Sequence, residues 1–201
     1  RKHHADMAGW SDDIVGLLFG ALDADDRHMR AAAGLTAFSD LIRDLIAERR
    51  IHRGDDVLSD LVAAQDHDDV LSDDEIIATC ILLLFAGHET TRNLLANGVR
   101  NLLQTPGAWQ QLGEKPDSAA AAVEEILRFD GPIKSMWRLA GADTVLGETH
   151  VASGQRVLLV QAAANRDPRR FDDPNTFNIA RNPNFHVGFG YAAHYCMGAA
   201  V

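Results

Sequence analysis

The segment Phe189-Gly190-Tyr191-Ala192-Ala193-His194-Tyr195-Cys196-Met197-Gly198 lies near the end of the chain and carries its strongest chemical signal. Cys196 follows a glycine-containing loop and precedes residues that can begin a helix. At such a position backbone N–H groups and the helix dipole favour a thiolate, which is the form that binds metals. His194 can donate a hydrogen bond to a carboxylate beside the metal. An isolated cysteine is more often a small buried apolar residue, but the surrounding loop favours Cys196 as a metal ligand.

The composition is that of a globular protein. The 201 residues suffice for one domain with a sizeable core, and 46% are apolar and 24% charged. The formal charge of −10, from 19 basic and 29 acidic residues, argues against nucleic acid or an anionic membrane as a partner. Because the sequence has only 2 cysteines, a disulfide scaffold is not expected. We expect a reducing, cytoplasmic location instead. The apolar run from Ile76 to Ala86 is too short to span a bilayer.

The first two-thirds of the chain is predicted to be helical. Ser72-Asp73-Asp74-Glu75 matches a capping box, so a long helix should run from there to about Leu103. Further helices are expected over 14–22, 35–50 and 118–129. Short strands are expected over 133–140, 144–146 and 156–160, and the stretch 165–195, rich in Pro, Asn and Gly, should be irregular. The fold class is therefore mainly α with small β-sheets.

A polar step interrupts the long helix at Ala86-Gly87-His88-Glu89-Thr90-Thr91. Threonine can bond back to an earlier carbonyl, and a glycine beside polar groups is a place where a helix can bulge and open a groove. The motif alone is equally compatible with a solvated step on a core helix. A zinc-protease site is excluded because Arg92 stands where the second histidine would belong.

The remaining candidates are weaker when taken one by one. Glu125 and Arg128 share a face of the helix over 118–129, where such a pair is most often a surface ion pair. Cys80 lies on an apolar face and is expected to fill the core. Trp10 and Trp109 are also predicted to be packing residues.

The cysteine segment resembles the haem-ligand loop of the cytochrome P-450 family, Phe-Gly-x-Gly-x-His-x-Cys-x-Gly. Phe189, Gly190, His194, Cys196 and Gly198 match this pattern. The resemblance runs in order from about residue 72 to residue 201. It implies the cytochrome P-450 fold and a haem b, with Cys196 as the axial ligand of the iron and the other matching residues around the cofactor.

One position of the loop departs from the family pattern. Ala192 stands where the family usually has glycine. If this position requires a positive φ, alanine costs about 1 kcal/mol or more. The departure affects the fine geometry of the loop rather than the choice of ligand.

The resemblance also implies roles for the polar step of the long helix. Glu89 and Thr90 would organise water and deliver protons to dioxygen on the iron. Ala86 and Gly87 would leave room over the haem. Arg138, on the first expected strand, would pair with a haem propionate, because a guanidinium suits a carboxylate in bidentate fashion.

Three charged residues are implied to form a buried network that fixes the cysteine loop. They are Glu125, Arg128 and Arg181, the last in a segment where Asn178 replaces the aspartate frequent in the family. Two further segments, 165–168 and 171–174, match the family's approach to the loop. Substrate contacts are expected at Ile133, Ser135 and Met136.

The implied function is an oxygen-activating monooxygenase, in which the thiolate pushes electron density onto iron to favour O–O cleavage. The substrate would be a small natural-product or lipid-like molecule of a bacterium. Electrons would come from a separate ferredoxin-type donor and its reductase, because no flavin domain is fused. A non-catalytic homologue that stabilises a partner enzyme is the alternative. Such relatives tend to lose the cysteine and the threonine, so the presence of Cys196 and Thr90 favours the enzyme.

Complete members of the family are much longer than this chain. Residues 1–201 are therefore interpreted as a single but partial cytochrome P-450 domain, its C-terminal haem-binding portion. The N-terminal sheet, the early helices and the helix after Cys196 are not part of it. Such a portion would leave one side of a haem uncovered, so we expect no competent oxygenase activity from this polypeptide by itself.

Overall fold

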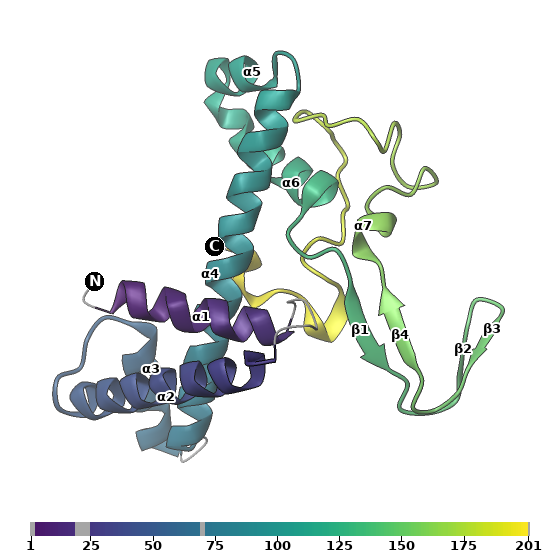
Figure 1. Cartoon of the computed structure of the whole chain (residues 1–201). Helices are drawn as coiled ribbons and strands as arrows, with labels where there is room; N and C mark the ends of the chain where they lie inside the picture. The colour runs from purple at the N-terminus through teal and green to yellow at the C-terminus, as the bar shows by residue number, and fades with distance from the viewer. Residues whose placement is uncertain (1–2, 19–24, 69–70, 201) are drawn as a thin grey trace. The chain divides into compact units, whose positions relative to one another are not determined.

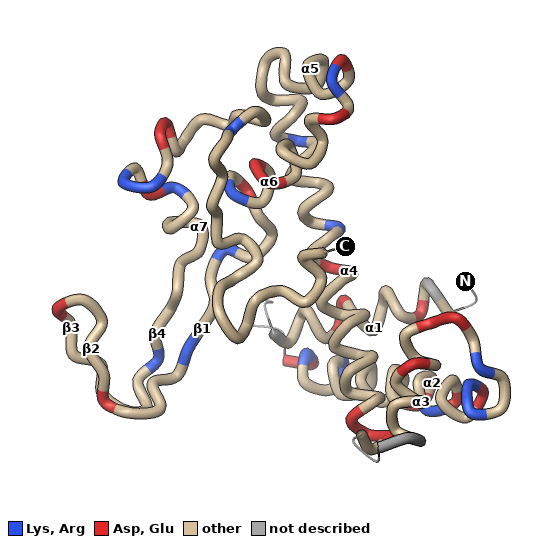
Figure 2. The backbone as a smooth tube through the Cα atoms, turned by 180° about the vertical axis from the view of Figure 1, so that it is seen from behind, with Lys and Arg blue, Asp and Glu red and all other residues tan. Residues whose placement is uncertain are grey.

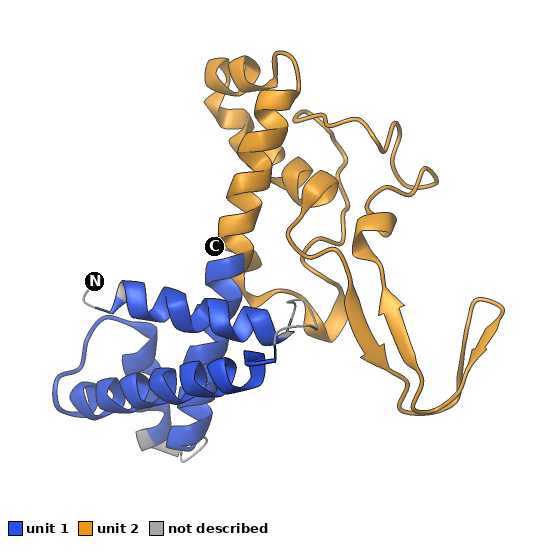
Figure 3. Cartoon of the chain, viewed as in Figure 1, with its two compact units in different colours: residues 1–89 blue, residues 90–201 orange. Residues whose placement is uncertain are grey.

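The structure is a computed structural model and describes residues 3–18, 25–68 and 71–200. Figure 1 shows the whole chain, which divides into two compact units, residues 1–89 and 90–201 (Figure 3). The division falls between Glu89 and Thr90, inside the long helix α4 (Asp73–Gln104). Each unit has a hydrophobic core of its own and is described by itself.

The first unit packs α1 (His4–Leu18), α2 (Arg27–Ile51), α3 (Val57–Asp68) and the beginning of α4. Its buried core consists of Ile42, Ile46, Val62, Ile76, Ile77 and Cys80. Trp10 packs edge-on against Phe38, with ring centroids 5.1 Å apart. Cys80 is 8% exposed, so the predicted packing roles of Trp10 and Cys80 are confirmed.

The capping box at the start of α4 is present as predicted. The Ser72 backbone N–H and hydroxyl both donate to Glu75 Oε2, at 2.7 and 2.8 Å, and the Glu75 N–H donates back to Ser72 Oγ at 3.3 Å. These bonds from Ser72 hold the pKa of Glu75 below its usual range. The helix ends at Gln104, one residue beyond the expected end.

The other helices of the first unit differ from the sequence-based expectation. α2 begins at Arg27 rather than at residue 35, and α3 was not expected. Asp56 caps α3, because its Oδ1 accepts the Ser59 N–H at 2.8 Å. α1 begins well before residue 14, and the end of the predicted helix 14–22 lies outside the described residues.

The second unit contains the rest of α4, α5 (Ala108–Glu114), the 3₁₀ turn η1 (Pro116–Ser118), α6 (Ala119–Asp130) and α7 (Gln161–Ala164). Its core consists of Leu102, Ala108, Ala122, Ile126, Phe177 and Ile179. α6 ends at Asp130, one residue beyond the expected end and directly before Gly131 and Pro132. Trp109 is 49% exposed, so its predicted packing role is wrong.

The strands form two separate antiparallel ladders. β1 (Met136–Leu139) pairs with β4 (Arg156–Leu159), and β2 (Thr144–Leu146) pairs with β3 (Thr149–Val151). The strand predicted over 133–140 is therefore shorter, because residues 133–135 have no partner in the ladder. Residues 165–191 contain neither helix nor strand, which confirms the irregular stretch.

Two short 3₁₀ turns flank the cysteine, η2 (Ala192–His194) and η3 (Met197–Ala200). Within the residues described, no helix combines the length and the apolar character needed to cross a membrane.

Candidate functional site

The cysteine loop is a tight turn held by its own backbone. The N–H of Cys196 donates to the carbonyl of Phe189 at 2.9 Å, and that of Tyr195 to the carbonyl of Ala192 at 3.0 Å. Gly190 has φ +79°, and a Cβ there would lie 3.2 Å from the His194 carbonyl. The turn therefore needs glycine at this position.

Ala192 adopts the left-handed conformation, with φ +59°. The sequence left open whether this position requires a positive φ, and the structure shows that it has one although the residue is an alanine. The loop therefore contains a strained residue that costs about 1 kcal/mol.

The sulfur of Cys196 is open to its surroundings. Cys196 is exposed and unpaired, and a Cβ on Gly198 would lie no closer than 3.8 Å to its Sγ. Cys80, in contrast, lies in the core of the first unit, and burial raises the pKa of its thiol. Of the two cysteines only Cys196 is accessible to a ligand. His194 is exposed as well and ends η2.

Metal-binding side chains do not gather around Cys196 in the part of the chain that the structure describes. In the described ranges, no group of three or more His, Cys, Asp or Glu side chains could hold a metal ion. A single cysteine thiolate is, however, the protein ligand by which some haem proteins hold their iron.

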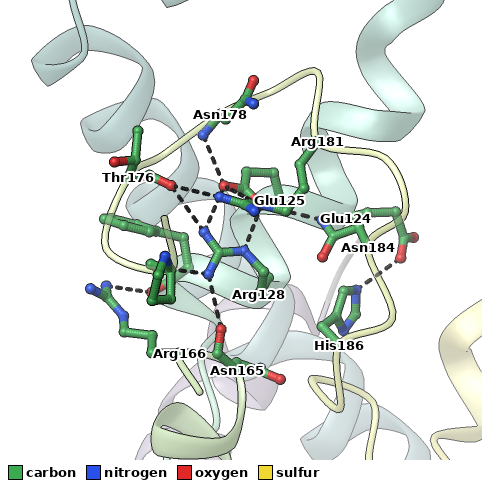
Figure 4. Close-up of polar contacts among 12 residues, drawn as sticks. Glu124, Glu125, Arg128, Asn165, Arg166, Thr176, Asn178, Arg181, Asn184 and His186 are labelled. Atoms are coloured by element: carbon green, nitrogen blue, oxygen red, sulfur yellow. Dashed lines mark hydrogen bonds and ion pairs between the residues drawn. The ribbon is translucent and has the colours of Figure 1, made fainter. Parts of the chain in front are cut away.

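Glu125 and Arg128 of α6 form an ion pair that is completely buried, with 0% exposure of both side chains. Arg128 Nε and Nη2 donate to the two Glu125 oxygens, each at 2.7 Å. Arg181 Nε donates to Glu125 Oε2 at 3.1 Å. The three residues singled out in the sequence therefore meet (Figure 4).

The other N–H groups of Arg128 donate to backbone carbonyls of the irregular stretch. The acceptors are Asn165 and Pro174, both at 2.9 Å, and Thr176 at 3.1 Å. With the two bonds to Glu125, all five guanidinium N–H groups are used. A buried ion pair is tolerable only when its groups are bonded in this way.

Polar residues that the sequence did not single out connect this network to the cysteine loop. Asn184 Nδ2 donates to Glu125 Oε2 at 3.2 Å, and the Val187 N–H donates to Asn165 Oδ1 at 2.8 Å. His186 Nε2 lies 2.8 Å from Glu124 Oε2. Figure 4 shows these side chains around the same turn of α6. Asn165 lay in a recognised motif, but no spacing pattern marked the others.

Arg138 is half-buried on β1, and its Nη1 donates to the carbonyl of Trp137 at 2.9 Å. Basic segments appear on both β1 and β4 in Figure 2. Arg138 lies opposite Val157, whereas Arg156 lies opposite Leu139. Because neighbouring positions of a strand point to opposite faces, Arg138 and Arg156 lie on different faces of the ladder.

The candidate substrate residues lie where the chain enters β1. Ile133 and Ser135 are half-buried and precede the strand, and Met136 is its first residue and 41% exposed.

The polar step of α4 is an uninterrupted α-helix, without the bulge that the sequence allowed. Ala86 and Gly87 are exposed, Glu89 and Thr90 are half-buried, and a Cβ on Gly87 would meet nothing within 4 Å. His88 Nδ1 is buried with no partner among the described residues. Ala86 to Glu89 belong to the first unit, whereas Thr90 and Cys196 belong to the second.

Several solved structures that resemble the chain are described as cytochromes P450. A structure described as cytochrome P450 CREJ in complex with (4-ethylphenyl) dihydrogen phosphate matches 99% of this chain and 49% of its own, with a TM-score of 0.92 and 36% identity. P450BioI in complex with hexadec-9Z-enoic acid ligated acyl carrier protein matches 100% of this chain and 51% of its own, with a TM-score of 0.93 and 33% identity.

Sequence comparison gives the same family. A steroid C26-monooxygenase of Mycobacterium tuberculosis (strain CDC 1551 / Oshkosh) is 37% identical over 189 residues, which are 94% of this chain and 50% of the relative. The chain thus spans about half the length of the curated relatives it matches. The sequence profile described as Cytochrome P450 matches residues 17–120 and 117–200. This chain belongs to the cytochrome P450 family.

Proposed function

We propose that the chain forms the haem-binding portion of a bacterial, cytoplasmic monooxygenase that receives electrons from a ferredoxin-type donor and its reductase. The exposed sulfur of Cys196, on a loop anchored to a buried charge network, is the observation that carries this proposal. Membership of the family supports haem b as the group that the sulfur holds.

The residues around Cys196 fit such a group. Its sulfur is accessible, and Gly198 keeps a side chain away from it. When bound, haem would supply the redox chemistry of dioxygen activation. Cys196 Sγ would hold the iron, while His194 and Arg138 would bind the propionates. Phe189 and Gly190 would contact the cofactor next to Cys196.

The polar step of α4 would handle protons. The Thr90 hydroxyl and the Glu89 carboxylate would hold water and pass protons toward the oxygen that is being reduced. The exposed Ala86 and Gly87 would leave space for dioxygen and substrate, since neither carries a large side chain.

The network of α6 would serve the cysteine loop. Glu125, Arg128 and Arg181 bind one another and the backbone of the irregular stretch that leads to Phe189. Their role would be to keep this backbone in one conformation, so that the sulfur is presented in a fixed direction.

A small organic, lipid-like or natural-product molecule is the substrate class that we favour, with contacts at Ile133, Ser135 and Met136. Two similar proteins support it: one is named a steroid C26-monooxygenase, and the other was solved with a fatty acid on an acyl carrier protein.

The absorption spectrum of the reduced, haem-loaded protein under carbon monoxide tests the proposal. A strongly red-shifted Soret band is expected, and Cys196→Ala should abolish it, whereas Cys80→Ala should keep it because that thiol lies in the core. Failure to bind haem, together with tight binding to another enzyme, would support a non-catalytic homologue instead.

The proton role has a separate test. Thr90→Ala should uncouple oxygen consumption from product formation, measured in the complete haem-loaded monooxygenase of which this chain is the proposed portion, supplied with a ferredoxin and its reductase. Thr91→Ala is the matched control, since it removes the same hydroxyl one position further along α4. Equal coupling in the two variants would contradict the proposed role of Thr90.

A further inference from the structure

His186 is a nearly buried histidine whose two ring nitrogens both have partners. Its side chain is 4% exposed. Nε2 lies 2.8 Å from Glu124 Oε2, and Nδ1 accepts the backbone N–H of Gly188 at 3.0 Å. No motif in the sequence singled out this histidine. It also makes no direct hydrogen bond to Cys196, whose N–H donates to the Phe189 carbonyl.

These two contacts select one form of the imidazole ring. Because Nδ1 accepts an N–H, it carries no proton, and the neutral ring then has its hydrogen on Nε2. That hydrogen is donated to the Glu124 carboxylate. The opposite tautomer would place two N–H groups against each other at Gly188 and would leave Nε2 facing a carboxylate without a hydrogen.

The contact with Gly188 holds the backbone directly before Phe189, the residue that is hydrogen-bonded to Cys196. A Cβ on Gly188 would lie 3.1 Å from His186 Nδ1 and 3.2 Å from the Leu127 carbonyl, so the backbone there is tightly enclosed. The next residue, Phe189, lies beside the imidazole with ring centroids 6.1 Å apart. Its carbonyl accepts the N–H of Cys196 at 2.9 Å.

Two consecutive carboxylates of α6 thus hold the same segment at two points. Glu125 is buried and binds Asn184, whereas Glu124 is 49% exposed and binds His186. The first contact belongs to the charge network, and the second lies outside it. The contact between Glu124 and His186 differs from an ordinary surface ion pair, because the imidazole is buried and also accepts a backbone N–H.

We infer that His186 is a positioning residue for the cysteine loop: Glu124 fixes its tautomer, and its Nδ1 fixes the Gly188 backbone before Phe189 and Cys196. The inference rests on the proposed role of Cys196 as haem ligand. Loss of the Nδ1 acceptor should let the loop relax and weaken the thiolate bond to iron.

The unaltered protein gives the first test, with a readout that does not depend on haem. Nitrogen-15 NMR of the labelled imidazole should show a protonated Nε2 and an unprotonated Nδ1. The Gly188 amide should be protected from hydrogen exchange. An Nδ1-protonated ring would overturn the inference, whether or not any variant folds.

Variants that separate the two nitrogens give the second test. His186→Asn keeps an acceptor on Cγ, where Nδ1 stands, whereas His186→Gln reaches toward Glu124 and offers no acceptor at that place. The Gln variant should exchange its Gly188 amide roughly fivefold faster, as expected for one lost hydrogen bond. It should also lose part of the red-shifted carbon monoxide band, and the Asn variant should restore both signals.

Matched substitutions at His150 are the controls, since this histidine is exposed on β3. His150→Asn and His150→Gln should change neither signal. The inference would be contradicted if His186→Gln kept the wild-type exchange rate of the Gly188 amide and the wild-type carbon monoxide band. It would also be contradicted if His186→Asn changed these two signals more than His186→Gln does. If neither the unaltered protein nor any variant shows the red-shifted band, the proposal that Cys196 is the haem ligand is refuted. The tautomer of His186 and the exchange rate of the Gly188 amide would still test whether His186 holds the Gly188 backbone.

Discussion

Glu125 and Arg128 face each other one turn apart on α6, with both side chains at 0% exposure and two hydrogen bonds of 2.7 Å between them. Removing two charges from water is costly, and their attraction offsets that cost only when the remaining donors and acceptors are also bonded. Here Arg128 has an acceptor for every N–H, and Glu125 also accepts the Asn178 N–H at 2.8 Å. The pair therefore depends on the irregular stretch as much as the stretch depends on the pair.

Arg128→Met should destabilise the protein by about 3–5 kcal/mol, because it leaves Glu125 charged and buried without its main partner. Denaturant unfolding measures the change. Arg169→Met is the control: Arg169 pairs with Asp167, but its side chain is 89% exposed. Solvent screens that pair, so no measurable loss is expected there. Similar losses in the two variants would contradict the importance of the buried network.

Ala192→Gly should stabilise the protein by about 1 kcal/mol, because glycine adopts a positive φ without steric cost. Thermal unfolding of the variant checks the sign. Ala193→Gly, one residue on and outside the left-handed region, should be neutral or destabilising instead. A loss of stability in Ala192→Gly would mean that the loop does not require its left-handed turn.

Gly98→Ala should destabilise the second unit in spite of the better helix propensity of alanine. A Cβ on Gly98 would lie 2.8 Å from Ile126 Cδ1 and 3.3 Å from its Cγ2. Overpacking costs about 1–3 kcal/mol, against a gain of about 1 kcal/mol from propensity. In an Ile126→Val background, which lacks Cδ1, Gly98→Ala should become neutral or stabilising. A double-mutant cycle in denaturant measures this coupling.

Asp130 should make the stability of the protein depend on pH in the acid range. Burial raises the pKa of Asp130, but hydrogen bonds from Lys134 and Asn101 and the charges of Lys134 and Arg100 outweigh it, so the net pKa lies below the usual range. A lowered pKa contributes stability that is present above the unfolded-state value of about 3.9 and is lost as pH falls through the folded-state value. Asp130→Asn should flatten this fall in unfolding free energies measured across the acid range. An unchanged pH profile would show that Asp130 is not the group responsible.

The helices whose ends carry strong local signals could be predicted from the sequence. Ser72 and Glu75 mark the start of α4, and Gly131 and Pro132 stop α6, because capping and chain-breaking act between neighbouring residues. The first turns of α2 could not be recognised, since Asp26 makes no side-chain cap and the residues up to Gly34 have no apolar period. The helix α3 could have been found from Asp56, a capping residue directly before it.

For the candidate site, the motifs predicted which residues meet but not how the loop is held. Glu125 and Arg181 were singled out through the family pattern, and they are in contact. Glu124 and His186 are also in contact, but 62 positions separate them in the sequence. No periodicity connects two such residues, because their meeting depends on the course of an irregular backbone.

The acceptors around Arg128 have a consequence for how this part of the protein opens. Residues 165–191 contain no helix or strand, yet three of their carbonyls bind one guanidinium. Opening the stretch at Asn165, Pro174 or Thr176 would leave buried N–H groups of Arg128 without acceptors, so local fraying there is unfavourable. Residues 165–176, which look like part of a long surface loop, should therefore unfold cooperatively with α6, and their protected amides should share one opening free energy.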